Sequence, residues 1–131
     1  MRQDMTDRYR TTELGAVKIN NNAIMTIASI AAMEIKGVNK VGGGIGKTLF
    51  DFLCKKGTTK GVKIIAGDSE IKLTVYITVE YGLDITRIAD DVQENVKRAV
   101  EKMTGLVLSA VDIVVEGVRS PYSKDKPGGR Q

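Results

Sequence analysis

The sequence contains no histidine, and this absence limits the chemistry that the protein can carry out. Histidine is the side chain most often used as a general base and as a transition-metal ligand. Without it, neither a Ser-His nor a Cys-His nucleophile can form, and zinc sites built on imidazole are excluded. Reactions that use carboxylates or a lysine remain open. We therefore expect a protein that is not an enzyme, with no catalytic residues, no metal site and no cofactor.

The sequence is also poor in cysteine and lacks a long apolar run. Cys54 is the single cysteine, which rules out an internal disulfide and favours a reducing cytoplasm. The longest apolar-rich stretch, residues 23–35, is interrupted by Thr26, Ser29 and Glu34 and is shorter than the roughly 20 residues that cross a bilayer. The first residues lack the apolar core of a secretory signal. We expect a cytoplasmic protein that sits peripherally at the inner face of the cell membrane through a partner.

The composition indicates one folded domain. The chain has 131 residues, 42% of them hydrophobic, and a net charge of +4 with a pI of about 9.2. This length supports a buried core, and the modest basic excess permits contact with nucleic acid or anionic lipid without requiring either. Residues 1–13 carry both signs of charge without periodicity, and residues 120–131 are polar and rich in proline and glycine. We expect flexible tails at 1–13 and 120–131 around a single domain at 14–119.

The central part of the chain changes from a strand pattern to a helix pattern. Over residues 71–81 apolar and polar residues alternate, as in a strand with one buried face. Over residues 85–103 apolar residues recur at helical spacing, with Asp84 as the expected N-cap and Gly105 as the stop. Three asparagines at 20–22 favour another helix start, because asparagine is a good N-cap. The expected elements are a strand at 16–19, a helix to about residue 36 that Gly37 ends, strands at 62–66 and 71–81, a helix at 85–103 and a strand at 107–118.

This order of elements, βαββαβ, predicts an α+β fold with two layers. The layers are a mostly antiparallel sheet and two main helices that lie on one face of it. Residues 42–61, in which glycines bracket a short apolar segment, are expected to form a loop that contains a short helix.

The sheet face away from the helices is the first candidate functional surface. Tyrosine, isoleucine and valine mixed with threonine on a sheet face suit docking or self-association. An ordinary solvated face is the alternative. The expected assembly surface consists of Lys72, Thr74, Tyr76, Thr78 and Glu80 on the long strand, with Ile65 and Val114 on the same side.

The glycine-rich loop at 42–61 is the second candidate. Gly46-Lys47-Thr48 resembles the end of a phosphate-binding P-loop, but the glycine that this motif needs is replaced by Val41. Gly43 and Gly46 also fit the G-x-x-G loop with which KH domains clamp a nucleic-acid backbone. Against a KH domain, five residues separate this loop from the preceding helix, and the last strand is surplus to the KH plan. The basic residues of this alternative nucleic-acid site are Lys47, Lys55, Lys56 and Lys60.

Three stretches of the sequence together resemble a known family. They are Gly15-Ala-Val-Lys-Ile with the helix up to Gly37-Val38, the corner Val79-Glu80-Tyr81-Gly82, and residues 92–106, VQENVKRAVEKMTGL. Over about residues 13–119 the chain is similar to the alkaline-shock and general-stress envelope proteins of Gram-positive bacteria. The resemblance implies an abundant cytoplasmic protein without catalytic activity. It also implies self-association, an integral-membrane anchor protein as partner and a part in the cell-envelope stress response.

Taken together, the sequence favours a non-enzymatic structural and interaction protein. Its expected partners are further copies of itself and a membrane anchor protein, with no small-molecule substrate. A nucleic-acid-binding module that uses the basic loop is the main alternative. An enzyme that uses carboxylates or Lys47 is a more distant one.

Overall fold

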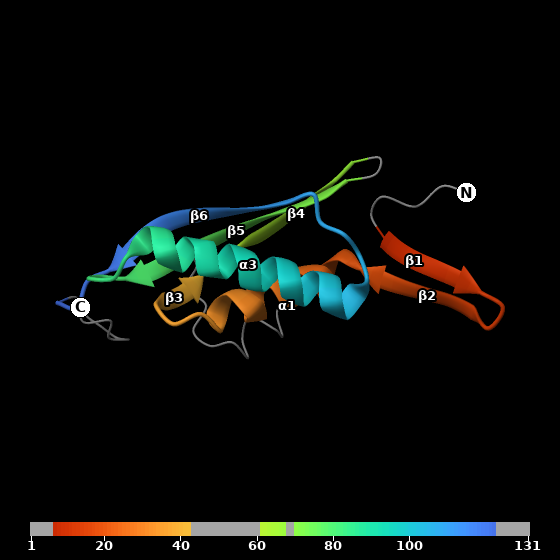
Figure 1. Cartoon of the computed structure of the whole chain (residues 1–131), viewed down its shortest axis with the longest axis horizontal. Coiled ribbons are helices and arrows are strands. Elements are labelled where there is room, and N and C mark those ends of the chain that lie inside the picture. The colour runs from red at the N-terminus through yellow and green to blue at the C-terminus, as the bar shows by residue number, and fades with distance from the viewer. Residues whose placement is uncertain (1–6, 43–60, 68–69, 123–131) are drawn as a thin grey trace.

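The strand expected from the alternating pattern at residues 71–81 forms the centre of the fold. The computed structural model describes residues 7–42, 61–67 and 70–122, and in it this strand is β5 (Ile71–Glu80) (Figure 1). Its side chains alternate strictly between buried and half-buried, because one face of the sheet is covered and the other is not. The apolar side chains in the middle of β5 have no exposed surface: Leu73, Val75, Ile77 and Val79.

The other strands pair with β5 on both of its edges. On one edge, β3 (Val38–Val41) and β4 (Val62–Ala66) run antiparallel to β5. On the other edge, β6 (Ala110–Arg119) runs parallel to β5. This parallel pair follows from the helix between the two strands, since a crossover helix carries the chain back to the end where it started.

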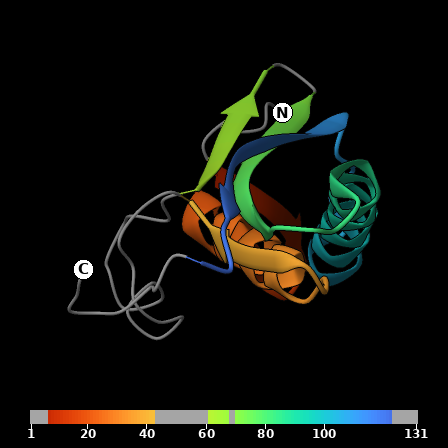
Figure 2. The same ribbon diagram turned by 90° about the vertical axis from the view of Figure 1, so that its left-hand side faces the viewer.

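Two helices cover one face of this sheet in the described part of the chain. They are α1 (Asn21–Met33) and α3 (Ile85–Thr104), which pack against each other and against the strands (Figure 1 and Figure 2). Residues at four-residue spacing on α3, from Ile88 to Val100, are buried against the sheet and α1. Asn95 ties the helices together, because its Nδ2 donates to the carbonyl of Ala31 at 2.8 Å. The expected α+β fold with two layers is therefore confirmed.

The ends of the helices follow from their capping residues. The Asn20 side chain accepts a hydrogen bond from the backbone N–H of Asn22 at 3.0 Å, and Asp84 accepts one from Arg87 at 3.2 Å. Each side chain satisfies an N–H that the first turn leaves without a helical partner. Gly105 ends α3 with φ +79°, a left-handed conformation that glycine adopts without steric cost. These three predicted boundaries are confirmed.

The edge strand formed by β3 and β4 is interrupted at a single position. The N–H of Gly42 donates to the Tyr76 carbonyl at 2.7 Å, while the N–H of Tyr76 donates to the Gly61 carbonyl at 2.8 Å. In an ordinary antiparallel pair, one residue would make both bonds. Val41 pairs with Ile77 and Val62 pairs with Val75, so the two glycines together fill one place in the strand. Residues 43–60 are thus inserted into an otherwise continuous strand.

The two glycines also fit this junction sterically. A Cβ atom on Gly61 would lie 2.6 Å from the backbone nitrogen of Gly42, which is closer than atoms can approach. Both residues have positive φ, +88° and +96°, which favours glycine. The short helix expected within 42–61 lies outside the described residues.

A β-hairpin precedes α1 and differs from the expectation. The strands β1 (Asp7–Thr12) and β2 (Gly15–Asn20) pair antiparallel as a separate sheet, and Figure 1 shows this hairpin extending away from the helices. We expected a tail at residues 1–13, and β1 corrects that expectation for residues 7–12. The residues of β1, DRYRTT, do not alternate between apolar and polar, so no pattern in the sequence indicated this strand.

Three further boundaries differ from the prediction. The strand β3 was not expected, and α1 ends at Met33 rather than near residue 36. Both differences have one cause: Gly37, at φ +105°, turns the chain so that its carbonyl accepts a hydrogen bond from Glu80 on β5 at 2.9 Å. β6 begins at Ala110 rather than at residue 107. Before it, the N–H of Leu108 donates to the Glu101 carboxylate at 2.8 Å, and this bond holds the chain in a loop.

Candidate interaction surface

The five residues predicted as an assembly surface lie together on the sheet face away from the helices. Each of them is half-buried and alternates along β5 with a buried core residue. We call this face of β3, β4, β5 and β6 the outer face. The structure therefore confirms their common position, while their role in assembly stays a prediction. The residues are Lys72, Thr74, Tyr76, Thr78 and Glu80.

Strand pairing adds apolar neighbours to these residues. Ile65 on β4 pairs with Lys72, and Val114 on β6 pairs with Tyr76. Ile65 is 55% exposed and Val114 is 38% exposed. The expectation that both lie on the outer face is confirmed. Val114 lies beside the half-buried Tyr76, and Ile65 lies beside Lys72, nearer the start of β5.

Charged groups of both signs lie beside these apolar side chains. The Lys72 ammonium lies 3.6 Å from the Asp112 carboxylate, and the Lys63 ammonium lies 5.9 Å from the centre of the Tyr76 ring. Both contacts are exposed, so each contributes only about 1 kcal/mol or less. Sequence reasoning did not assign Lys63 or Asp112 to this surface, although alternation along β4 and β6 would have placed both there.

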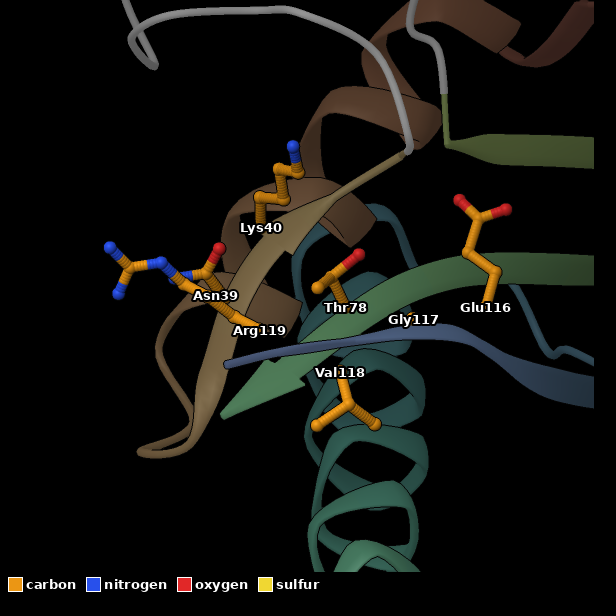
Figure 3. A pocket seen from close by; sticks show the side chains of 7 residues that line it. All are labelled: Asn39, Lys40, Thr78, Glu116, Gly117, Val118 and Arg119. Atoms are coloured by element: carbon orange, nitrogen blue, oxygen red, sulfur yellow. The ribbon is translucent and has the colours of Figure 1, made fainter. Parts of the chain in front are cut away.

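The second half of the outer face contains a polar pocket of about 430 Å³ at the ends of β3, β5 and β6 (Figure 3). Beside it, the Asn39 amide donates to the Glu80 carboxylate at 3.2 Å. Thr78, a predicted surface residue, lies at the centre of this pocket. Its other charged lining residues, Lys40, Glu116 and Arg119, were not predicted, because register irregularities in β3 and β6 place them there and leave no signal in the sequence.

The other predicted site cannot be placed. Lys47, Lys55, Lys56 and Lys60, the basic residues of the nucleic-acid alternative, lie outside the described residues. On the described part of the outer face, three carboxylates, Glu80, Asp112 and Glu116, lie among the cations. Across the part of the chain that the structure describes, no three metal-ligating side chains come together. Neither α1 nor α3 has the length and apolar composition of a membrane-spanning helix.

One carboxyl group away from this face is perturbed. The pKa of Glu101, on α3, is held below its ordinary value of 4.5, chiefly by a hydrogen bond from Lys97. The Lys97 ammonium lies 2.8 Å from the carboxylate, and the N–H of Leu108 donates a second bond. These partners fasten the loop between α3 and β6, so the shift reflects structure rather than a reactive site.

Comparison with known proteins gives a consistent result over most of the chain. A family model matches residues 9–120, and its description is the alkaline-shock protein 23 family, with a cell envelope-related function. YqhY, an uncharacterized protein of Bacillus subtilis, is 33% identical over 111 residues, which span 85% of this chain and 82% of YqhY. A protein of Streptococcus pyogenes named stress response regulator gls24 homolog is 24% identical over 119 residues, which span 90% of this chain and 64% of that protein. Among solved structures, MamM-CTD is 16% identical and has a TM-score of 0.47, over 75% of this chain and 99% of that chain.

Proposed function

Because the chain belongs to the alkaline-shock protein 23 family, described by a cell envelope-related function, we propose that it is a non-enzymatic interaction protein of the cell-envelope stress response. The family membership confirms the resemblance seen in the sequence. A stress role is supported by the similarity to the Streptococcus pyogenes protein named a stress response regulator homolog. In this proposal the protein associates with copies of itself and docks on a membrane-anchored partner.

The outer face is the observation that carries the proposal. Helices cover one face of the sheet. The opposite face presents the half-buried Tyr76 ring beside Val114, with Ile65 also on this face, next to Lys72 nearer the start of β5. The surrounding charges are balanced in sign, as they are around many protein–protein contacts, where an apolar centre has a polar rim. A face of this kind is better suited to a protein surface than to a polyanion.

Self-association through this face can be tested by one substitution. Tyr76→Glu places an unpaired carboxylate at the centre of the contact, which costs about 3–5 kcal/mol when buried and weakens the Kd of self-association by about 100-fold or more. Tyr81→Glu is the matched control, because Tyr81 is exposed but lies beyond the end of β5.

Light scattering over a range of concentrations measures the effect. The native protein and Tyr81→Glu are expected to form the same oligomers, whereas Tyr76→Glu is expected to remain a monomer with an unchanged circular dichroism spectrum. A native protein that is monomeric at every concentration would contradict the proposal, as would equal effects of the two substitutions.

Docking on a membrane protein has its own test. The purified protein is mixed with native membranes and, separately, with protein-free vesicles made from the lipids of those membranes. Sedimentation with the membranes but not with the vesicles is expected if the partner is a protein. Equal binding to both would show that lipid alone suffices and would contradict this part of the proposal.

A further inference from the structure

Two β-bulges converge on one residue at the end of the central strand. The register of β3 against β5 shifts between Val38 and Lys40, which leaves Asn39 as an extra residue. The register of β6 against β5 shifts at Thr78, which leaves Glu116 as an extra residue. Thr78 is consequently paired with a bulged strand on each side. Bulges redirect side chains and are over-represented next to functional sites.

The pocket in Figure 3 is built by these bulges. Both extra residues, Asn39 and Glu116, line it, and Thr78 lies between them. The side chains of Lys40, Thr78 and Glu116 point to the same side of three neighbouring strands, whereas Val118 points to the opposite side. The pocket is therefore formed by side chains on paired strands rather than by a loop.

The floor of the pocket is kept open by a glycine. Gly117 pairs with Thr78 across β5 and β6. A Cβ atom at Gly117 would lie 3.4 Å from the Thr78 hydroxyl oxygen, so a larger side chain would cover this hydroxyl. With glycine there, the Thr78 hydroxyl can both donate and accept a hydrogen bond inside the pocket.

Opposite charges stand on the two sides of this floor. Lys40 comes from β3 and Glu116 from β6, on either side of β5, and strands two apart are separated by about 10 Å. Arg119 adds a second cation to the lining. Lys40 and Arg119 also take part in interactions within the chain, and each of these side chains has several donors. A ligand with one sign of charge would satisfy one side and be repelled by the other.

We propose that this pocket binds a small zwitterion, with its anionic oxygens at Lys40 and Thr78 and its primary ammonium at Glu116. Two sources share this chemistry: a phosphoethanolamine headgroup, and a free amino acid or short peptide. A nucleic-acid backbone does not fit, because Glu116 and the nearby Glu80 repel a polyanion. The ligand is bound without being converted. The site is complete within one chain, so it does not depend on self-association.

Titration of the full-length protein, followed by ¹⁵N–¹H NMR spectra, tests the proposal. The probes are phosphoethanolamine and glycylglycine, with inorganic phosphate, acetate and ethylammonium as ligands of one charge. Saturable shifts at the amides of Thr78 and Gly117 are expected with at least one zwitterion, at about tenfold lower concentration than with any ligand of one charge. The zwitterion that binds more tightly identifies the source.

Two substitutions separate the halves of the site. Glu116→Gln should weaken zwitterion binding about tenfold and strengthen phosphate binding, because it removes a repelling carboxylate, whereas Lys40→Met should weaken both. Glu94→Gln, an exposed carboxylate on α3 that pairs with Arg98, is the matched control and should change nothing. The proposal is overturned if no probe gives saturable shifts at these amides, if phosphate or acetate binds as tightly as the zwitterions, or if Glu116→Gln binds zwitterions like the native protein.

Discussion

The interruption of the edge strand predicts that residues 43–61 can be removed without loss of the fold. In the shortened chain Gly42 is joined directly to Val62. In the native protein, Gly42 supplies the N–H and Gly61 supplies the carbonyl that bond to Tyr76. In the shortened protein, Gly42 would supply both. Val41 and Val62 keep their partners Ile77 and Val75. The result is one continuous strand along the edge of β5.

The expected change in stability follows from loop closure. By the length of the insertion alone, closing a loop of 18 residues costs roughly 2.5 kcal/mol of chain entropy. The shortened protein should therefore be more stable than the native protein by up to that amount. Replacing residues 43–60 by a glycine–serine segment of equal length is the matched control, because it keeps the loop length and so separates the entropy of loop closure from the effect of the residues removed.

Urea unfolding followed by circular dichroism measures both variants. A shortened protein that loses its native spectrum, or that unfolds at a lower urea concentration than the native protein, would refute the reasoning. The same variant also tests the nucleic-acid alternative, because it lacks Lys47, Lys55, Lys56 and Lys60. We expect no gel shift with single-stranded RNA at low salt from either protein. A shift that the native protein shows and the shortened protein lacks would restore that alternative.

Three further predictions follow from the structure. Gly37→Ala should destabilise the protein by about 1–3 kcal/mol, since φ is +105° and the new Cβ would lie 2.7 Å from Ile88 Cδ1. The control Gly67→Ala, with open space around the new Cβ, should have little effect on the urea midpoint. The pKa of Glu101 is lower in the folded protein than its ordinary value of 4.5, so the stabilisation from this group is present above about pH 4.5 and is lost as the pH falls through the folded pKa. Between pH 7 and pH 3, the free energy of unfolding of Glu101→Gln should therefore fall less than that of the native protein. An equal fall in both proteins would contradict the assignment. Leu73→Ala, in the fully buried centre of β5, should cost about 2–5 kcal/mol in urea unfolding, and a cost below 1 kcal/mol would show that this core position is not close-packed.

The fold could be predicted where burial imposes a period on the sequence. The alternation that defines β5 and the four-residue spacing on α3 both arise because one side of each element faces the core. The hairpin strand β1 and the short edge strand β3 were missed because pairing with a neighbour forms them, and pairing of this kind leaves no periodic signal. The parallel direction of β6 likewise depends on a crossover of the chain rather than on the residues of β6.

The same distinction applies to the candidate surface. The predicted residues on β5 share a face because alternation in a strand fixes which side each residue occupies. The pocket around Thr78 was not predicted because it depends on where the registers of β3 and β6 shift relative to β5. Asn39 and Glu116 are the bulge residues at these register shifts, and the amino-acid composition of β3 and β6 does not indicate a bulge. Only the glycine at 117 interrupts the pattern of β6, and one glycine does not reveal a bulge.

A photo-crosslinking amino acid at position 76 tests the central claim most directly, because it reports what touches the outer face. With this residue at position 76 of the purified protein, illumination should join two copies covalently, at residues on β4, β5 or β6 of the second copy. With the same residue at position 81, no joined copies should form. Crosslinks from position 81 alone, or none from position 76 at concentrations where the protein is oligomeric, would contradict the account.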